Sequence, residues 1–431
     1  MPYARVTCYT TYMNKLLTVF EASQILGVSP DTIRRWDKKG LIKAQRSNLN
    51  HRLFNIDELK RIHSKVSGEH KGNNYKIYKS NKKTKYSVIE LFAGAGGTAI
   101  GFHNAGLQHT LLTDWDKDAT TTLKKNKPKW NVIQSDIREL NFKGMKADIV
   151  EGGFPCQAFS YAGKKQGFED TRGTMFFEFA RCIKEVRPKI AMGENVRGLL
   201  KHDDGKTLNT IINVLKDLGY NVAFKVLRAQ YLDVPQKRER LIILAVRKDL
   251  DIPILFPKER DYTISLREAL ENVPASGGQS YPKRKKEILE MIPQGGYWRN
   301  LPIALQKEYM QSSFFMGGGK TGMARRLSWD EPSLTLTCAT AKKQTERCHP
   351  TETRPLTVRE YARIQTFPDD WAFTGSQSSQ YKQIGNAVPA NLSYHMGKCL
   401  IAMLENKPDL KTMDMVEPQN TSSPLVQTSL F

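Results

Sequence analysis

The sequence lacks long apolar runs, paired cysteines and acidic residues in excess. No apolar run in its 431 residues approaches the roughly 20 residues of a membrane-spanning helix, and the N-terminus has no apolar signal core. We therefore expect a cytoplasmic protein that does not contact membranes. The six cysteines form no C-x-x-C pair, which argues against a disulfide framework and a finger-type zinc site. Cys338, Cys348 and His349 lack a fourth ligand at the usual spacing, so we expect no metal.

The charge balance is strongly basic. The chain holds 66 Lys and Arg against 44 Asp and Glu, a formal net charge of +22, which exceeds what solubility requires. Residues 1–85 contribute +12 of this charge, with 18 basic against 6 acidic residues. Such an excess is typical of a polyanion binder, and nucleic acid is the expected partner. An acidic membrane surface is the alternative, but the basic residues do not follow one side of an amphipathic helix.

The first segment predicts two short helices joined by a glycine turn. The apolar spacing of residues 18–26 predicts a helix that ends at Gly27, and Ser29 caps a second, basic helix. Residues 46–54 are typical of a small hairpin wing, and residues 57–65 of a third helix. Two helices around a tight turn, the second of them basic, indicate a DNA-binding helix-turn-helix.

This order, with Lys39-Gly40-Leu41-Ile42 between helix and wing, resembles the DNA-binding domain of MerR-type regulators. The expected DNA contacts are Thr32, Arg34, Arg35 and Arg52. MerR-type regulators usually continue into a long dimerising helix, whereas residues 67–85 here are polar and basic and predict a linker after a unit of residues 1–66. A small packing domain with a charged solvent face is the alternative.

From residue 86 the pattern changes to strands that alternate with helices, which predicts an α/β, Rossmann-like domain with a mixed, mostly parallel sheet. Strands are predicted at residues 88–92, 110–113, 131–133, 147–150, 189–192, 222–228 and 241–246. The glycine-rich turn at residues 92–97 lets a ligand approach the backbone closely. Many nucleotide sites share such a turn, and no Lys-Ser/Thr follows it as in a phosphate-binding P-loop.

Acidic residues end the next two strands. Asp114 lies about twenty residues past the glycines, where an acid hydrogen-bonds a ribose hydroxyl, and Trp115 can stack on an adenine. Asp136 ends the third strand and suits an exocyclic amine. Together they predict an adenosine-containing cofactor, although each acid could equally cap a helix.

The apolar strand that ends at Val150 leads through two glycines to Pro155 and Cys156. The ligand crevice of an open α/β sheet lies outside such strand ends, so Cys156 is a candidate nucleophile; a buried structural cysteine is the alternative. The loop that follows is expected to close over nucleic acid as a lid, although it could also be a solvated loop without function. Its candidate contacts are Ser160, Lys164 and Lys165.

Glu194 ends the next strand and would share the crevice with Cys156 if the two strands are neighbours. Arg238 or Arg240 pointing into the crevice would stabilise a thiolate or grip a substrate oxygen, and a surface salt-bridge cluster is the alternative.

Residues 253–350 lose the strand-helix rhythm and are rich in Gly, Pro and basic residues, which predicts a recognition domain. Arg325 and Arg326 are its expected contacts to phosphates or base edges. The helical pattern resumes at residues 351–405, and residues 406–431 are expected to be a flexible tail.

Taken in order, these stretches resemble the DNA (cytosine-5)-methyltransferases. The family strings are Phe-x-Gly-x-Gly-Gly at residues 92–97, Pro-Cys-Gln at 155–157, Glu-Asn-Val at 194–196, Gln-x-Arg-x-Arg at 236–240 and Gly-Asn-Ala-Val-Pro at 385–389. Five strings in the family's order and spacing make the resemblance specific. It implies a catalytic domain of residues 86–252 and 351–405 around a target-recognition domain of residues 253–350.

The resemblance implies methyl transfer from S-adenosylmethionine to carbon 5 of a cytosine that is flipped out of a short duplex sequence. Cys156 would add to carbon 6, Glu194 would protonate N3 or share a proton with it, and Arg238 would hold the O2 side, with Arg240 nearby. The implied cofactor residues are Phe92, Gly94, Gly96, Gly97, Asp114, Trp115, Asp136, Pro155 and Asn386. The family more often has Glu at the position of Asp114.

The resemblance also implies a modification enzyme that is paired with a restriction endonuclease and acts on double-stranded DNA as a monomer. The helix-turn-helix would then bind an operator as a dimer and repress the enzyme's own transcription, or it would only add non-specific affinity for DNA. Two other functions stay open, a DNA-binding regulator with an inactive methyltransferase half and an RNA cytosine-5 methyltransferase. The intact Cys156, Glu194 and Arg238 argue against the first, and the long recognition region favours duplex DNA over RNA.

Overall fold

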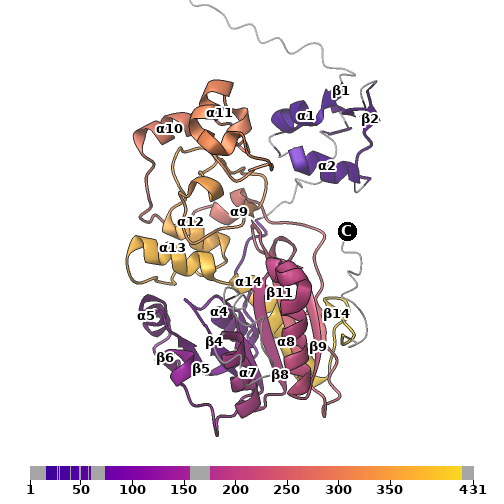
Figure 1. Ribbon diagram of the computed structural model, residues 1–431, viewed down its shortest axis with the longest axis vertical. Helices are drawn as coiled ribbons and strands as arrows, with labels where there is room; N and C mark the ends of the chain where they lie inside the picture. Colours follow the sequence, from indigo (N-terminus) through magenta and orange to yellow (C-terminus); the bar gives the residue numbers. More distant parts are fainter. Residues whose placement is uncertain are drawn as a thin grey trace, which may run out of the picture.

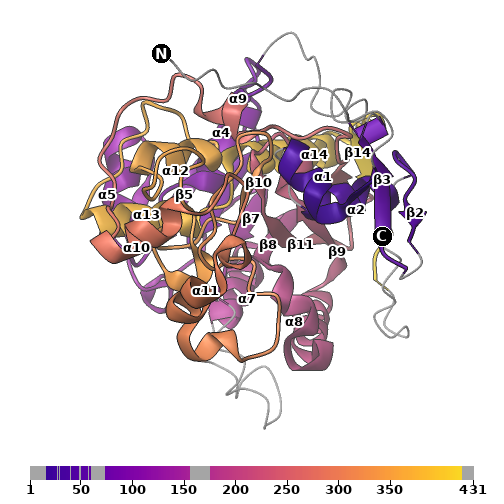
Figure 2. The ribbon, with the colours of Figure 1, turned by 90° about the horizontal axis from the view of Figure 1, so that it is seen from above.

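The computed structural model describes residues 16–26, 28, 30–38, 40–47, 50–56, 58–59, 73–155 and 175–419. These residues form an N-terminal unit, a sheet with helices on both faces, and the predicted recognition domain, which lies above the sheet in Figure 1. Figure 2 shows the N-terminal unit on the side of the sheet where β11 and β9 lie, away from α5 and α13.

The N-terminal unit is a helix-turn-helix with a small sheet. It consists of β1 (Leu16–Thr18), α1 (Val19–Leu26), α2 (Pro30–Lys38), β2 (Gln45–Arg46) and β3 (Arg52–Asn55). β3 pairs antiparallel with both β1 and β2, so the predicted wing is confirmed. Ala22, Ile33, Trp36 and Phe54 are buried in one core. The third predicted helix falls mostly outside the described residues.

The central sheet has seven strands in the order β6-β5-β4-β7-β8-β11-β9. They are β4 (Ser87–Leu91), β5 (Gln108–Asp114), β6 (Val132–Gln134), β7 (Ile149–Gly152), β8 (Ile190–Val196), β9 (Tyr220–Arg228) and β11 (Glu239–Arg247). Strands β4 to β8 are parallel, whereas β11 runs antiparallel to both β8 and β9. All seven predicted strands and the mixed, mostly parallel sheet are therefore confirmed.

The strand order reverses between β4 and β7. From β4 the chain moves to β5 and β6 on one side, and it returns to β7 on the other side. Such a reversal leaves a crevice at the carboxyl ends of the two strands, because their loops leave in opposite directions. The loop after β4 holds the glycine-rich turn, and the loop after β7 leads toward Cys156.

Helices cover both faces of the sheet. One face packs against α4 (Gly97–Ala105) and α14 (Ala390–Glu405), and the other against α7 (Met175–Val186) and α8 (Lys206–Asp217). α4 and α14 touch at their backbones, because a Cβ on Gly101 would lie 2.4 Å from the carbonyl oxygen of Ala390. α5 (Lys117–Asn126) follows β5.

The C-terminal part, residues 351–405, has the helical pattern that the sequence predicts, but it is divided into separate helices. It forms α12 (Val358–Ile364), α13 (Gln377–Asn386) and α14, with a break at residues 387–389. Pro389 precedes the first residue of α14, a position that suits proline because it has no N–H to donate. The break holds Asn386 at the end of a helix instead of inside one.

The recognition domain contains little regular structure. It includes α9 (Leu266–Leu270), α10 (Lys283–Glu290), α11 (Ile303–Met310) and β13 (Ser333–Leu334). Its own core holds Leu289, Trp298 and Met310. β13 pairs in parallel with β10 (Gln236–Lys237), which immediately precedes β11, so the domain joins the sheet at the carboxyl edge of the parallel strands.

Two predicted flexible segments are anchored in the structure. Residues 73–85 are not a free linker, since Tyr75 donates its hydroxyl to the carbonyl of Arg363 and Tyr78 stacks on Tyr394. Residues 406–419 are not a frayed tail, because β14 (Met413–Met415) pairs antiparallel with β12 (Leu255–Pro257). The boundary predicted at residue 253 is therefore wrong as well, since β12 packs in a hydrophobic core of the seven-stranded sheet.

Among the helices of the described residues, none has the length and apolar content that a bilayer span requires.

Candidate active site

The glycine-rich turn after β4 has one open position and two packed positions. A Cβ on Gly94 would meet no atom within 4 Å, and its backbone adopts a φ of +53°. A Cβ on Gly96 would lie 2.6 Å from Leu123, and a Cβ on Gly97 would lie 2.1 Å from the carbonyl oxygen of Val388. Of these predicted cofactor residues, Gly94 faces open space, whereas the Cα atoms of Gly96 and Gly97 face protein neighbours. Phe92 begins the turn with a φ of +58°.

Asp114 and Trp115 lie at the end of β5, as predicted. The carboxylate of Asp114 accepts the amides of Gly94 and Asp116, both at 2.8 Å. Burial raises the pKa of Asp114, although these two hydrogen bonds oppose the shift. A carboxylate offers about four acceptor sites, so two remain for a ligand. The indole of Trp115 is 76% exposed, and Asp116 rather than Asp114 caps α5.

Asp136 caps a single 3₁₀ turn, Ile137–Glu139, which is one of the alternatives that its sequence position allowed. It also pairs with Arg138, whose guanidinium lies 2.5 Å from the carboxylate. Hydrogen bonds from Arg138 lower the pKa of Asp136 to about 2. The carboxylate is therefore ionised and already has a cation beside it, so a ligand amine would have to share it with Arg138.

Asn386, predicted from the Gly-Asn-Ala-Val-Pro string, is exposed at the end of α13. Its side-chain oxygen accepts a hydrogen bond from the thiol of Cys338 at 2.8 Å. Trp371 donates its indole N–H to the carbonyl of Ala95 at 3.2 Å, so the segment before α13 holds the glycine-rich turn in place.

Glu194 and Arg240 form a nearly buried ion pair at the carboxyl end of β8. The Nε atom of Arg240 lies 2.5 Å from a carboxylate oxygen of Glu194, and the two side chains are only 10% and 12% exposed. The N–H does not point at this oxygen, so the contact is an ion pair without an aligned hydrogen bond. Burial raises the pKa of Glu194, and the charge of Arg240 opposes the shift.

The loop after β7 lies against this ion pair. The side-chain amide of Asn195 donates to the carbonyl of Phe154 at 2.8 Å, which ties the loop after β7 to the end of β8. A Cβ on Gly153 would lie 3.2 Å from a carboxylate oxygen of Glu194. β7 and β8 pair in parallel, which confirms the prediction that these two strands are neighbours. Pro155 is exposed and is the last described residue of this loop, since Cys156, Ser160, Lys164 and Lys165 lie outside the described residues.

The prediction that Arg238 holds the substrate is corrected by its surroundings. Arg238 is 2% exposed, and its guanidinium donates to the carbonyl oxygens of Leu336 at 3.1 Å and Gly385 at 3.0 Å. It joins the recognition domain to the end of α13 next to Asn386. The arginine beside Glu194 is Arg240, which the sequence left as the other candidate.

The predicted DNA contacts of the N-terminal unit fall into two groups. Arg34, Arg35 and Arg52 remain at least partly exposed, although Arg34 pairs with Asp31 and Arg52 with Asp37. Thr32 is 5% exposed, and its hydroxyl donates to the carboxylate of Glu331 in the recognition domain. Its prediction as an outward DNA contact is wrong in this arrangement, because the first turn of α2 contacts Glu331.

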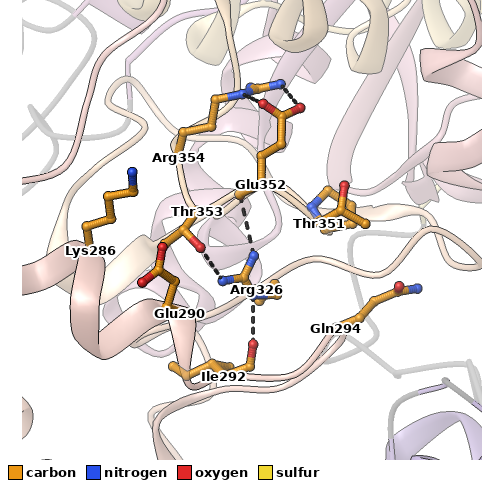
Figure 3. Close-up of a pocket in the computed structure, with 10 residues that line it drawn as sticks. Lys286, Glu290, Ile292, Gln294, Arg326, Thr351, Glu352, Thr353 and Arg354 are labelled. Atoms are coloured by element: carbon orange, nitrogen blue, oxygen red, sulfur yellow. Dashed lines mark hydrogen bonds and ion pairs between the residues drawn. The ribbon is translucent and has the colours of Figure 1, made fainter. Parts of the chain in front are cut away.

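Arg326 is a structural residue rather than the predicted DNA contact. It is 4% exposed, and its guanidinium donates to the carbonyl oxygens of Leu289, Ile292 and His349. It lies beneath a polar cavity of about 590 Å³ whose walls carry charges of both signs, including Lys286 and Glu352 (Figure 3). Arg325 is also buried, which lowers its pKa, and it lies over the ring of Tyr297.

A group of buried charges near the site was missed from the sequence. Glu151 on β7 is 2% exposed, and Glu90 on the neighbouring β4 is fully buried and pairs with His109 at 2.8 Å. The available signal was an acid inside each of two short, otherwise apolar strands.

Comparison with known proteins identifies both parts of the chain. Residues 86–402 match the family model of the C-5 cytosine-specific DNA methylases, and residues 18–54 match that of the MerR family regulatory proteins. Two similar proteins are named type II methyltransferases. M.Eco47II of Escherichia coli is 55% identical over 405 residues, covering 89% of this chain and 95% of that protein. M.PspPI of Psychrobacter sp. (strain TA137) is 51% identical over 396 residues, covering 89% and 95%.

Solved structures share the fold. Spodoptera frugiperda DNMT2 superimposes with a TM-score of 0.54 at 18% identity, covering 74% of this chain and all of that one. Entamoeba histolytica methyltransferase EhMeth gives a TM-score of 0.51 at 15% identity, covering 75% and 99%. Sheet, motifs and family model agree: the chain belongs to the C-5 cytosine-specific DNA methylases, and it is a DNA (cytosine-5)-methyltransferase with an N-terminal MerR-like helix-turn-helix unit.

Proposed function

We propose that this methyltransferase uses S-adenosylmethionine and a covalent adduct of Cys156 to methylate carbon 5 of a flipped cytosine in a short duplex sequence. The observation that carries this proposal is the nearly buried Glu194 and Arg240 pair beside Gly153, three residues before Cys156. A carboxyl group whose pKa is raised by burial can deliver a proton to a ring nitrogen.

The residues at the ends of β4 and β5 fit S-adenosylmethionine. The open surface at Gly94 leaves room for the donor, Asp114 has free acceptor sites for a ribose hydroxyl, and the exposed indole of Trp115 suits an adenine ring. Asn386 and Phe92 would border the same space, with Asp136 shared between the donor and Arg138 and with Pro155 at the β7 side. When bound, the cofactor supplies an electrophilic methyl group.

The chemistry of cytosine assigns the roles of the protein side chains. Carbon 5 is a weak nucleophile, so the Cys156 thiolate would first add to carbon 6. The electron pair displaced by the new S–C bond moves toward N3, where Glu194 would donate a proton. Carbon 5 then accepts the methyl group and loses its proton to a base. Elimination of Cys156 breaks the S–C bond and returns the N3 proton to Glu194.

Arg240 would take the role that the sequence gave to Arg238. Its guanidinium lies against Glu194 and would reach the O2 side of the same pyrimidine edge. Arg238 would act indirectly, because its hydrogen bonds join Leu336 to Gly385, the residue before Asn386.

Flipping the base costs a few kcal/mol in lost stacking and pairing. Contacts of the recognition domain and of the loop with Ser160, Lys164 and Lys165 would offset this cost. The proposed biological role is modification of DNA alongside a restriction endonuclease, as the type II names of the relatives suggest.

We also propose that the helix-turn-helix unit binds an operator as a dimer and represses transcription of the methyltransferase gene. Arg34, Arg35 and Arg52 remain at least partly exposed for phosphate or base contacts. The first turn of a recognition helix normally enters the major groove, so the contact of Thr32 with Glu331 would have to open for operator binding. The alignment with M.Eco47II covers 89% of this chain, which is more than the four-fifths that follow residue 85, so that relative shares part of the N-terminal segment.

The Cys156→Ser variant should lose methyl transfer by a factor on the order of 10³ or more. With S-adenosylmethionine present, it should also form no denaturant-stable adduct with a duplex that contains 5-fluorocytosine. A base cannot remove fluorine from carbon 5 as it removes the proton, so an enzyme that has added to carbon 6 stays bound after methylation. Labelled methyl incorporation and gel electrophoresis measure the two effects. Cys338→Ser changes an exposed thiol and should still form the adduct. An adduct with Cys156→Ser would contradict the mechanism.

Substitution by Lys should distinguish the roles of Arg238 and Arg240. Arg238→Lys should lower the free energy of unfolding by about 1–3 kcal/mol, because an ammonium cannot satisfy both buried carbonyls. Arg240→Lys should keep most of that stability and lower the rate of methyl transfer about 10²-fold, because the fork beside Glu194 is lost. Urea denaturation and single-turnover assays measure these effects, and the reverse pattern would return the substrate role to Arg238.

Trp115→Ala should bind S-adenosylmethionine about threefold to tenfold more weakly, because an aromatic stack contributes about 0.5–1.5 kcal/mol. Trp115→Phe keeps a ring and should bind with nearly the affinity of the unchanged protein. Calorimetric titration without DNA measures the dissociation constant independently of turnover. An unchanged constant in Trp115→Ala would remove this residue from the cofactor site.

Removal of residues 1–66 should spare methyl transfer and abolish binding to the promoter fragment upstream of the gene. This boundary keeps Tyr75 and Tyr78, which anchor the following segment on the catalytic domain. A full-length double variant, Arg34→Ala with Arg35→Ala, retains Thr32 and should lose the promoter shift as well. If the truncated protein shifts the fragment with unchanged affinity, the regulatory proposal is wrong.

A further inference from the structure

A row of buried charged residues crosses the sheet beneath the active site. Glu90, Glu151 and Glu194 follow Val88, Ile149 and Met192 by two positions on three neighbouring strands. Alternate residues of a strand share a face, so these carboxyls lie on the face that carries α4 and α14. Glu90 and Glu151 are direct partners across β4 and β7.

The two ends of this row have a side-chain hydrogen bond or ion pair, whereas the middle has neither with any described residue. A carboxylate oxygen of Glu90 lies 2.8 Å from the ring Nε2 of His109 on β5, and Glu194 pairs with Arg240 on β11 at 2.5 Å. Glu151 lies between them, and no hydrogen bond or ion pair joins it to another described residue. The charged groups that act on it among the described residues are the carboxyls of Glu90 and Glu194.

The side chain of Glu194 leans toward β7. Its carboxylate oxygen lies 3.2 Å from the position that a Cβ on Gly153 would occupy. Gly153 and Glu151 are alternate residues of the same segment and share the face on which Glu194 lies. The carboxyl of Glu194 therefore lies over the end of β7, on the same side as Glu151 and two residues beyond it.

An unpaired ionised carboxylate between two other carboxyls would be strongly destabilised in a buried position. Burial, followed by the charges of Glu90 and Glu194, raises the pKa of Glu151 well above its usual value. Glu151 therefore holds a proton under conditions in which an exposed glutamate has lost it. Two neighbouring carboxyls that cannot both ionise easily titrate as a pair rather than separately.

We propose that Glu151 and Glu194 form a carboxyl pair that shares one proton, so that Glu194 meets cytosine N3 as an acid. This inference rests on the proposed role of Glu194 in the methyl-transfer reaction and adds Glu151 as a positioning residue that acts through it. When Cys156 adds to carbon 6, the shared proton moves to N3 and the pair becomes doubly ionised beside Arg240. When Cys156 is eliminated, N3 returns the proton, so the pair ends the cycle unchanged.

The test is the pH profile of the single-turnover methyl-transfer rate in Glu151→Gln. Glutamine keeps the shape and removes the second carboxyl. Without a like-charged neighbour, Glu194 beside Arg240 should lose its proton at lower pH. The loss of rate on the alkaline side of the profile, its alkaline limb, should therefore occur about one pH unit lower. At a given pH on this side, the rate should be about tenfold smaller than in the unchanged protein.

Two further variants make the result decisive. Glu346→Gln removes a fully buried carboxyl of the recognition domain and should leave the limb where it is. Glu151→Asp keeps a carboxyl at a greater distance and should move the limb by less than Glu151→Gln. Should Glu151→Gln fail to fold, as judged by circular dichroism, the shift in Glu151→Asp decides the question. An unmoved alkaline limb in the folded Glu151 variant overturns the pair.

Glu194→Gln separates this inference from the proposed function. If Glu194→Gln loses methyl transfer while Glu151→Gln keeps the unchanged profile, Glu194 acts alone and only the pair is wrong. If Glu194→Gln retains full activity, the proposed role of Glu194 is wrong, and the proposed carboxyl pair is wrong as well.

Discussion

The reversal of strand order between β4 and β7 is the constraint on which the site depends. It sends the glycine-rich turn and the loop toward Cys156 away from each other, and the space between them becomes the crevice. β8 then adds Glu194 beside β7, and β11 adds Arg240 from the opposite direction. Residues far apart in the sequence meet because five parallel strands present their carboxyl ends at one edge. The recognition domain joins at this same edge through β10 and β13.

Much of this arrangement could be predicted from the sequence, since buried parallel strands are short apolar runs and the polar residues after them mark the functional edge. The roles of the two arginines could not. Arg238 lies between β10 and β11, and only Arg240 is inside a strand of the sheet. The alternation of side-chain directions along a strand therefore does not relate the direction of Arg238 to that of Arg240. The partners of Arg238, Leu336 and Gly385, lie about a hundred or more residues further along the chain, and local pattern contains no information about them.

The prediction that Arg325 and Arg326 contact DNA failed for a related reason. A domain with few helices and strands leaves many carbonyl groups without backbone partners, and buried carbonyls need donors. Arg326 donates to several of them at once, and Arg347 donates to the carbonyl of Thr335. Arginine suits this task because its planar fork carries five donors. Part of the positive charge of the chain therefore stabilises an irregular backbone and does not report contacts with DNA.

The C-terminal segment has a consequence for how the sheet meets other molecules. β9 is one outer strand of the sheet and has nine residues, and a long outer strand offers unpaired amides and carbonyls to any other extended chain. Here the amide of Gln419 bonds to the carbonyl of Val222, and Asp414 pairs with Lys225 in the middle of β9. The opposite outer strand, β6, has only three residues. Residues 414–419 thus cover part of the β9 edge, and their removal would expose backbone groups there to strand pairing with another molecule, far from the active site.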